Sequence, residues 1–215
     1  MLLAIWPPAH AADAAPVLLV VGDSLSAGHG IDPGQGWVAL LQKRLEAGGY
    51  GYRVVNASIS GDTTTGGLAR LPRALALHRP AIVFIELGGN DGLRATPATV
   101  VRDNLSAMAR LALEAGARVV LAGMEMPPNY GPRYTAEFAA IYPAVAKALD
   151  TALVPFFLDK VALDAALMQG DGIHPNAAAQ PRLLDNAWPA IEQAMRSAAS
   201  SPGGRRPGNT GAATR

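Results

Sequence analysis

The chain has 215 residues, of which 50% are hydrophobic and 16% are charged. This length and composition fit one globular domain with a sizeable core. No run of about eighteen apolar residues occurs, so we expect no membrane-spanning helix. Cysteine is absent, which excludes disulfides and thiolate chemistry.

The net charge of +1 is unevenly placed along the chain. The segment from Ser197 carries Arg205, Arg206 and Arg215 and no acidic residue. Without these three, 15 of the 18 basic residues remain against 17 acidic residues, so the body carries a charge of about −2. A body without a basic excess predicts no nucleic-acid partner.

The two ends of the chain differ in composition from the middle. Residues 1–6 are apolar and residues 9–12, Ala-His-Ala-Ala, are similar to a small-x-small cleavage site, but a basic region and a longer apolar stretch are missing. We interpret residues 1–15 as a leader remnant, which predicts a periplasmic or secreted protein, or else as a disordered extension. Residues 199–215 are rich in Ser, Pro and Gly and predict a disordered tail. The folded domain is then 16–198.

Five short apolar runs between these ends predict β-strands. Unbroken apolar runs rich in β-branched residues are typical of strands buried on both faces. The runs are 17–21, 53–56, 81–85, 117–121 and 152–155.

Segments with helical periodicity separate these runs. One helix is predicted over 37–45, where Val38, Leu41 and Leu45 share one face. Further helices are predicted over 100–115, 136–149 and 177–198. The last has Asn176 as its N-cap, and Pro181 should bend it or delay its regular part. Strands that alternate with helices predict an α/β domain of three layers around a parallel sheet. Ligands of such sheets bind outside the carboxyl ends of the strands.

A glycine-rich or polar block follows each predicted strand. The carboxyl ends of parallel strands meet at one edge of the sheet, so these blocks should share one rim. The blocks are 22–24, 58–62, 88–91, 126–130 and, after a short crossover, 171–174.

Two of these blocks hold a serine, an aspartate and a histidine, which are Ser24, Asp171 and His174 in chain order. A free serine is too weakly acidic to attack an ester at neutral pH, and it needs a histidine to take its proton and a carboxylate to orient that histidine. Taken singly, Gly-Asp-Ser and Gly-Asn-Asp are more often turns than sites. Together, in this order and each after a strand, the blocks favour a catalytic site.

The blocks 22–26, Gly61, 88–91 and 171–174 resemble the four signature blocks of GDSL or SGNH hydrolases. The resemblance runs from about Val17 to Trp188. Longer stretches are similar to the bacterial periplasmic thioesterase I, lysophospholipase and arylesterase group. These stretches are 56–63, 67–72, 86–94 and 171–176.

The resemblance implies a flavodoxin-like sheet of five parallel strands in the order 2-1-3-4-5. It implies a serine esterase without cofactor or metal that hydrolyses small acyl esters or thioesters through an acyl-enzyme. Ser24 is then the nucleophile at a helix start, His174 the base and later the acid, and Asp171 the residue that orients His174. The oxyanion hole consists of the Ser24 N–H, the Gly61 N–H, whose bare backbone permits close approach, and the Asn90 amide.

The sequence disfavours three other function classes. A noncatalytic flavodoxin-like module that binds a small ligand or nucleotide is the alternative, but neither a P-loop nor Gly-x-Gly-x-x-Gly occurs. The four histidines lack the ligand spacing of a metallohydrolase. No Gly-x-Ser-x-Gly frames a serine, as an α/β-hydrolase would require.

Several neighbouring residues receive a structural interpretation. Asp23 is expected to bond the backbone of its turn, Asp91 to cap a helix, and Trp37 to pack a helix. His29 and His78 are expected to be surface or loop residues. A further cluster either lines an acyl groove or packs in the core, and the sequence leaves both open: Met124, Met126, Tyr130, Tyr134 and Phe138.

Overall fold

The computed structural model describes residues 15–199. The predicted leader or extension and the predicted tail lie outside the described residues, apart from one residue of each. Five parallel strands form one sheet in the order β2-β1-β3-β4-β5, which confirms the predicted topology. The strands are β1 (Val17–Gly22), β2 (Arg53–Asn56), β3 (Ile82–Glu86), β4 (Arg118–Ala122) and β5 (Ala152–Val154).

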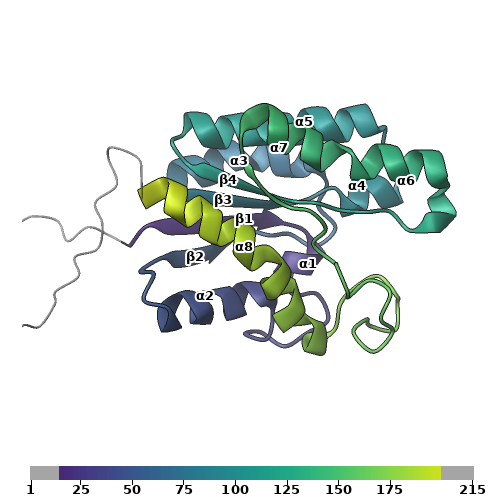
Figure 1. Cartoon of the computed structure of the whole chain (residues 1–215), viewed down its shortest axis with the longest axis horizontal. Helices are drawn as coiled ribbons and strands as arrows, with labels where there is room; N and C mark the ends of the chain where they lie inside the picture. The colour runs from purple at the N-terminus through teal and green to yellow at the C-terminus, as the bar shows by residue number, and fades with distance from the viewer. Residues whose placement is uncertain (1–14, 200–215) are drawn as a thin grey trace, which may run out of the picture.

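Helices cover both faces of this sheet and complete three layers (Figure 1). On one face lie α3 (Thr64–His78), α5 (Ala98–Glu114) and α7 (Ile141–Leu149). On the other face lie α2 (Trp37–Ala47) and α8 (Gln180–Ala199). No helix within residues 15–199 is long and apolar enough to cross a membrane.

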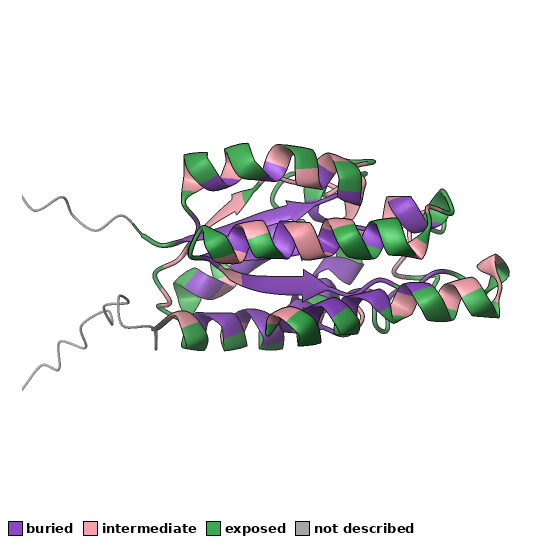
Figure 2. Cartoon of the chain, turned by 90° about the horizontal axis from the view of Figure 1, so that it is seen from above, coloured by how far each residue is buried: buried purple, intermediate pink, exposed green. Residues whose placement is uncertain are grey.

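The core lies along both faces of the central strands. Every residue of β1 and β3 is buried, and the inward stripes of the helices are buried with them (Figure 2). Trp37 of α2 is fully buried, with its ring centroid 5.0 Å from that of Phe84 and 5.3 Å from that of Phe157. The prediction that Trp37 packs its helix against the core is confirmed.

The helix predicted over 136–149 is wrong, because two helices occupy this stretch. The first is α6 (Pro132–Ala139), and α7 begins after Ala140. Pro143 has no N–H to donate to the carbonyl four residues before it, so a continuous helix would lack this bond. The last helix agrees better with its prediction. The Asn176 side chain accepts from the N–H groups of Ala178 and Ala179 in a short 3₁₀ turn (Ala177–Ala179). The regular helix α8 then begins at Gln180, next to Pro181.

Helix α3 was not predicted from the sequence, because it contains residues that are unfavourable in helices. Gly66, Gly67 and Pro72 all lie within it, and glycine and proline have the lowest helix propensities. Packing overrides this preference: Leu71 and Leu75 are buried, and a Cβ at Gly67 would come within 2.2 Å of Leu87. The sequence also did not predict α4 (Gly89–Leu93) or the 3₁₀ turn η1 (Pro128–Tyr130) at the rim.

Candidate active site

Ser24, His174 and Asp171 lie in one chain of contacts. The Oγ of Ser24 is 2.9 Å from Nε2 of His174, and Nδ1 of His174 is 2.6 Å from Oδ2 of Asp171. Ser24 is the first residue of α1 (Ser24–Ala27), two residues after the end of β1, whereas the other two lie in the loop between β5 and η2 (Ala177–Ala179). The structure therefore brings Ser24 together with His174, which follows it by 150 positions, and with Asp171 from the same loop as His174.

The loop of Asp171 and His174 is stabilised by Asp171 itself. Its Oδ1 accepts the N–H groups of Ile173 (2.9 Å) and His174 (3.0 Å), while Oδ2 contacts the imidazole. These bonds, the one from the His174 ring first, hold the pKa of the Asp171 carboxyl well below its usual range. Gly172 has a φ of 67°, the left-handed conformation that favours glycine in this tight turn.

His29 lies closer to the site than the sequence indicated. It is an exposed loop residue, as expected, but its ring centroid is 4.5 Å from that of His174. Gln169 joins the two loops, because its Nε2 donates to the carbonyls of His29 (2.8 Å) and Pro175 (3.0 Å). The spacing of the histidines contained no signal for this contact, since it depends on how the two loops fold.

The two backbone donors assigned to an oxyanion hole have no acceptor among the described residues. No group within residues 15–199 accepts a hydrogen bond from the N–H of Ser24 or of Gly61. Gly61 has a φ of 80°, and a Cβ there would meet no protein atom within 4 Å. Backbone conformation, rather than packing within the protein, therefore explains the glycine at this position.

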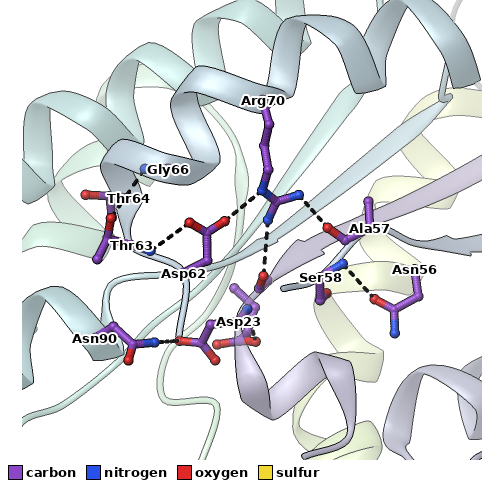
Figure 3. Close-up of polar contacts among 12 residues, drawn as sticks. Asp23, Asn56, Ala57, Ser58, Asp62, Thr63, Thr64, Gly66, Arg70 and Asn90 are labelled. Carbon is purple, nitrogen blue, oxygen red and sulfur yellow. Dashed lines mark hydrogen bonds and ion pairs between the residues drawn. The ribbon is translucent and has the colours of Figure 1, made fainter. Parts of the chain in front are cut away.

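Asn90, the third donor, lies on α4 after β3 and contacts Asp23 (Figure 3). Its Nδ2 donates to Oδ2 of Asp23 at 3.0 Å. Oδ1 of Asp23 accepts the N–H of Leu25 at 3.0 Å, so Asp23 is the N-cap of α1, as its predicted structural role requires. The sequence did not predict the second role of Asp23, which is to hold Asn90.

A buried carboxyl pair lies behind the nucleophile. Glu86, the last residue of β3, is fully buried, and its Oε2 accepts the hydroxyl of Ser26 at 2.6 Å and the N–H of Asp23 at 3.4 Å. Burial raises the pKa of Asp23 to about 6. Burial and the nearby Asp23 charge raise the pKa of Glu86 well above its usual value.

No role for Glu86 was predicted from the sequence. The available signal was a charged residue at the end of an apolar run, which is unusual at a buried position. Gly22 makes room for the pair, because a Cβ there would lie 2.7 Å from Oε2 of Glu86 and 2.8 Å from the Ser26 side chain. The indole Nε1 of Trp37 donates to the Ser26 hydroxyl at 3.2 Å and joins this network to the core.

Asp91 caps a helix, as predicted, although the helix is α3 rather than its own. Its Oδ2 accepts the N–H of Thr64 at 2.8 Å, and its Oδ1 accepts the Thr64 hydroxyl at 2.6 Å. These bonds tie the segment that carries Asn90 to the segment that follows Gly61.

The cluster left open between acyl groove and core divides into two parts. Met124, Met126 and Phe138 are buried and belong to the core. The hydroxyls of Tyr130 and Tyr134 donate to the carbonyls of Leu93 and Thr96, both at 3.1 Å, and so support the segment after α4. His78, the other histidine expected at the surface or in a loop, is the last residue of α3.

Comparison with known proteins connects this geometry to a family. The sequence profile of the GDSL-like lipase/acylhydrolase family matches residues 20–181. Esterase TesA of Pseudomonas aeruginosa is 61% identical over 179 residues, which are 83% of this chain and 89% of that protein. Thioesterase 1/protease 1/lysophospholipase L1 of Escherichia coli K12 is 47% identical over 174 residues, 81% of this chain and 82% of the relative.

A solved structure shares the fold at similar coverage. Esterase EstA of a Pseudoalteromonas species, inhibited by monoethylphosphonate, superposes with a TM-score of 0.80 at 38% identity. The match covers 84% of this chain and 98% of that one.

Proposed function

Because the chain belongs to the GDSL-like lipase/acylhydrolase family and is a serine esterase, we propose that Ser24, His174 and Asp171 carry its reaction. The observation that supports this assignment is the pair of contacts on the His174 ring. Nε2 lies 2.9 Å from the Ser24 hydroxyl and Nδ1 lies 2.6 Å from the Asp171 carboxylate. One ring nitrogen thus faces the nucleophile while the other is held by an acid.

In the first half of the reaction, Oγ of Ser24 attacks the carbonyl carbon of an acyl ester or thioester. The hydroxyl proton passes to Nε2 of His174, and the Asp171 carboxylate stabilises the imidazolium that forms. The tetrahedral intermediate collapses as His174 returns this proton to the leaving alcohol or thiol. The acyl group then remains on Ser24.

In the second half, water replaces the alcohol or thiol. His174 takes a proton from the water, and the hydroxide attacks the acyl carbon. The second tetrahedral intermediate releases the carboxylic acid as Oγ of Ser24 regains its proton. The enzyme returns to its starting state without a cofactor.

The negative charge on the substrate oxygen is stabilised by the N–H groups of Ser24 and Gly61 and by Nδ2 of Asn90. Nδ2 carries two hydrogens, and Asp23 accepts one of them. The other is free to bind the oxyanion. Each donor of this kind contributes about 10²- to 10³-fold to turnover.

The proposed substrates are small acyl esters and thioesters. The printed names of relatives support both classes, since one is an esterase and another a thioesterase and lysophospholipase. We also place the protein in the periplasm or outside the cell, on the basis of the Ala9–Ala12 run. Cell fractionation checks the location, and recovery in the cytoplasm alone would reject it.

Ser24→Ala tests the assignment on a short p-nitrophenyl ester. We expect kcat to fall by about 10³-fold or more, because no other group replaces the nucleophile. Ser106→Ala on α5 is the matched control and should retain activity. A folded Ser24→Ala protein with wild-type turnover would remove Ser24 from the mechanism.

A further inference from the structure

We propose that Arg70 is a positioning residue of the oxyanion hole, which fixes the loop of Gly61 against the carboxyl end of β1. The inference rests on the proposed function and adds a residue to it. Arg70 lies on α3, and its guanidinium group binds three acceptors, one at the end of β1 and two in the connection between β2 and α3 (Figure 3). Nε contacts Oδ2 of Asp62 at 2.7 Å, Nη2 donates to the carbonyl of Gly22 at 3.2 Å, and Nη1 donates to the carbonyl of Ala57.

These acceptors lie beside the two backbone donors of the hole. Gly22 precedes Ser24 by two residues, and Asp62 follows Gly61 directly. The backbone bond from the Asp62 N–H to the Ile59 carbonyl, 3.1 Å, closes the turn of Gly61 internally. The Ile59 N–H also donates to the Gly22 carbonyl at 3.0 Å, so the backbone joins this turn to the end of β1 at one point. Arg70 adds side-chain bonds at Asp62 and Gly22 and thereby fixes the position of one donor relative to the other.

The ion pair of Arg70 is well shielded from water. The side chains of Arg70 and Asp62 are 22% and 12% exposed, whereas those of the Arg44–Asp185 pair are 34% and 51% exposed. Charge-assisted bonds of a shielded pair resist screening by salt better than those of an exposed pair. The guanidinium binds these acceptors through three separate nitrogens in one plane, whereas a lysine presents all its donors on a single nitrogen and cannot reproduce this spread.

Gly66 supplies a second, independent observation. A Cβ at Gly66 would lie 2.0 Å from Oδ1 of Asp62, which accepts the N–H of Thr63 at 2.9 Å. Gly66 and Arg70 are four residues apart and therefore lie on the same face of α3. Together they form a cradle for the Asp62 carboxylate: one makes room for it and the other binds it.

This cradle should affect the rate more than the binding of substrate. An oxyanion donor stabilises charge that appears only in the transition state, so its displacement lowers kcat and leaves KM nearly unchanged. A misplacement of about 1 Å can cost about 10²-fold in rate. Arg70 contacts no reacting atom in this arrangement and acts through Gly61.

Arg70→Lys is the direct test, measured on a p-nitrophenyl ester. We expect kcat to fall by about 10- to 100-fold with KM within about 3-fold of wild type. Phosphonylation of Ser24 by an ethyl p-nitrophenyl phosphonate should slow in the same proportion, because the phosphoryl oxygen uses the same donors. Arg44→Lys, the same substitution in the 2.7 Å ion pair with Asp185 on the opposite layer, is the control and should keep the wild-type kcat.

Gly66→Ala displaces Asp62 while Arg70 remains, and it keeps the inference testable if Arg70→Lys does not fold. We expect the same loss of kcat. The kcat of the double variant should be about equal to that of the slower single variant, because both substitutions act on one contact. A folded Arg70→Lys or Gly66→Ala protein with kcat within about 2-fold of wild type, or with a change in KM alone, would overturn the proposal.

Failure of this inference is distinguishable from failure of the proposed function. If Ser24→Ala abolishes turnover while Arg70→Lys does not change it, only the role of Arg70 is rejected. If Ser24→Ala retains turnover, the catalytic assignment itself is rejected and the role of Arg70 with it.

Discussion

Asn90 presents an amide whose orientation decides whether it donates or repels. An unanchored carboxamide could turn its oxygen toward the developing oxyanion. A carboxylate can accept from the amide nitrogen but not from the amide oxygen, so Asp23 fixes which end of the Asn90 amide is Nδ2. The adjacent Leu25 N–H fixes the carboxylate in turn.

Asn90→Ala removes this donor without disturbing the core, since Asn90 is only half-buried. We expect kcat to fall by about 10²- to 10³-fold while the circular dichroism spectrum is retained. Asn186→Ala on α8 deletes another half-buried amide, whose contacts with the carbonyls of Phe157 and Asp159 lie outside the site, and should keep kcat. An unchanged rate in the folded Asn90→Ala protein would exclude Asn90 from the oxyanion hole.

The carboxyl of Asp23 also makes stability depend on pH. Its pKa is about 6 in the folded protein, against an ordinary value of 3.8, and burial is the main cause. The folded protein therefore holds this proton more tightly than the unfolded chain. The stabilisation from Asp23 is complete below about pH 4 and is lost as the pH rises through about 6.

Asp23→Asn removes this titration. The difference in free energy of unfolding, variant minus wild type, should increase between pH 4 and pH 8 by on the order of 2 kcal/mol. Urea unfolding at both pH values measures the difference, with exposed Asp103→Asn as control. A difference that stays constant, or that decreases as the pH rises, would show that Asp23 does not titrate as described.

At the scale of elements, the site depends on helix α3, which was not predicted from the sequence. Gly66, Gly67 and Pro72 are each unfavourable in a helix by local propensity. Two of them have tertiary reasons, because Gly66 makes room for Asp62 and Gly67 for Leu87. Helix propensity reflects only the local cost, so the helix that carries Arg70 could not be predicted from it.

The cap of α3 should contribute measurably to stability. Asp91 is buried and accepts both the N–H and the hydroxyl of Thr64. Asp91→Ala leaves these two donors without their acceptor and should lower the free energy of unfolding by about 1–3 kcal/mol. Asp103→Ala, at an exposed position of α5, should change it by less than about 0.5 kcal/mol. Equal effects of the two substitutions in urea unfolding would contradict this role of Asp91.

At the scale of the whole molecule, the parallel sheet and its rim could be predicted because they follow from simple patterns, whereas the strand order was implied by the family resemblance. Unbroken apolar runs mark the buried strands, and the polar blocks after them place Ser24, Asp171 and His174 on one edge of a parallel sheet. The support behind the rim could not be predicted. The contacts of Glu86 with Ser26, Arg70 with Gly22, and His29 with His174 join segments far apart in the chain.

Mass spectrometry of the intact protein after reaction with an ethyl p-nitrophenyl phosphonate tests the central claim most directly. The phosphonate loses p-nitrophenolate and forms a bond to the attacking oxygen. We predict a single adduct that peptide mapping assigns to Ser24, and its formation should be slowed strongly by His174→Ala. An adduct on another residue, or equal labelling of wild-type and Ser24→Ala protein, would contradict the assignment of Ser24 as the nucleophile.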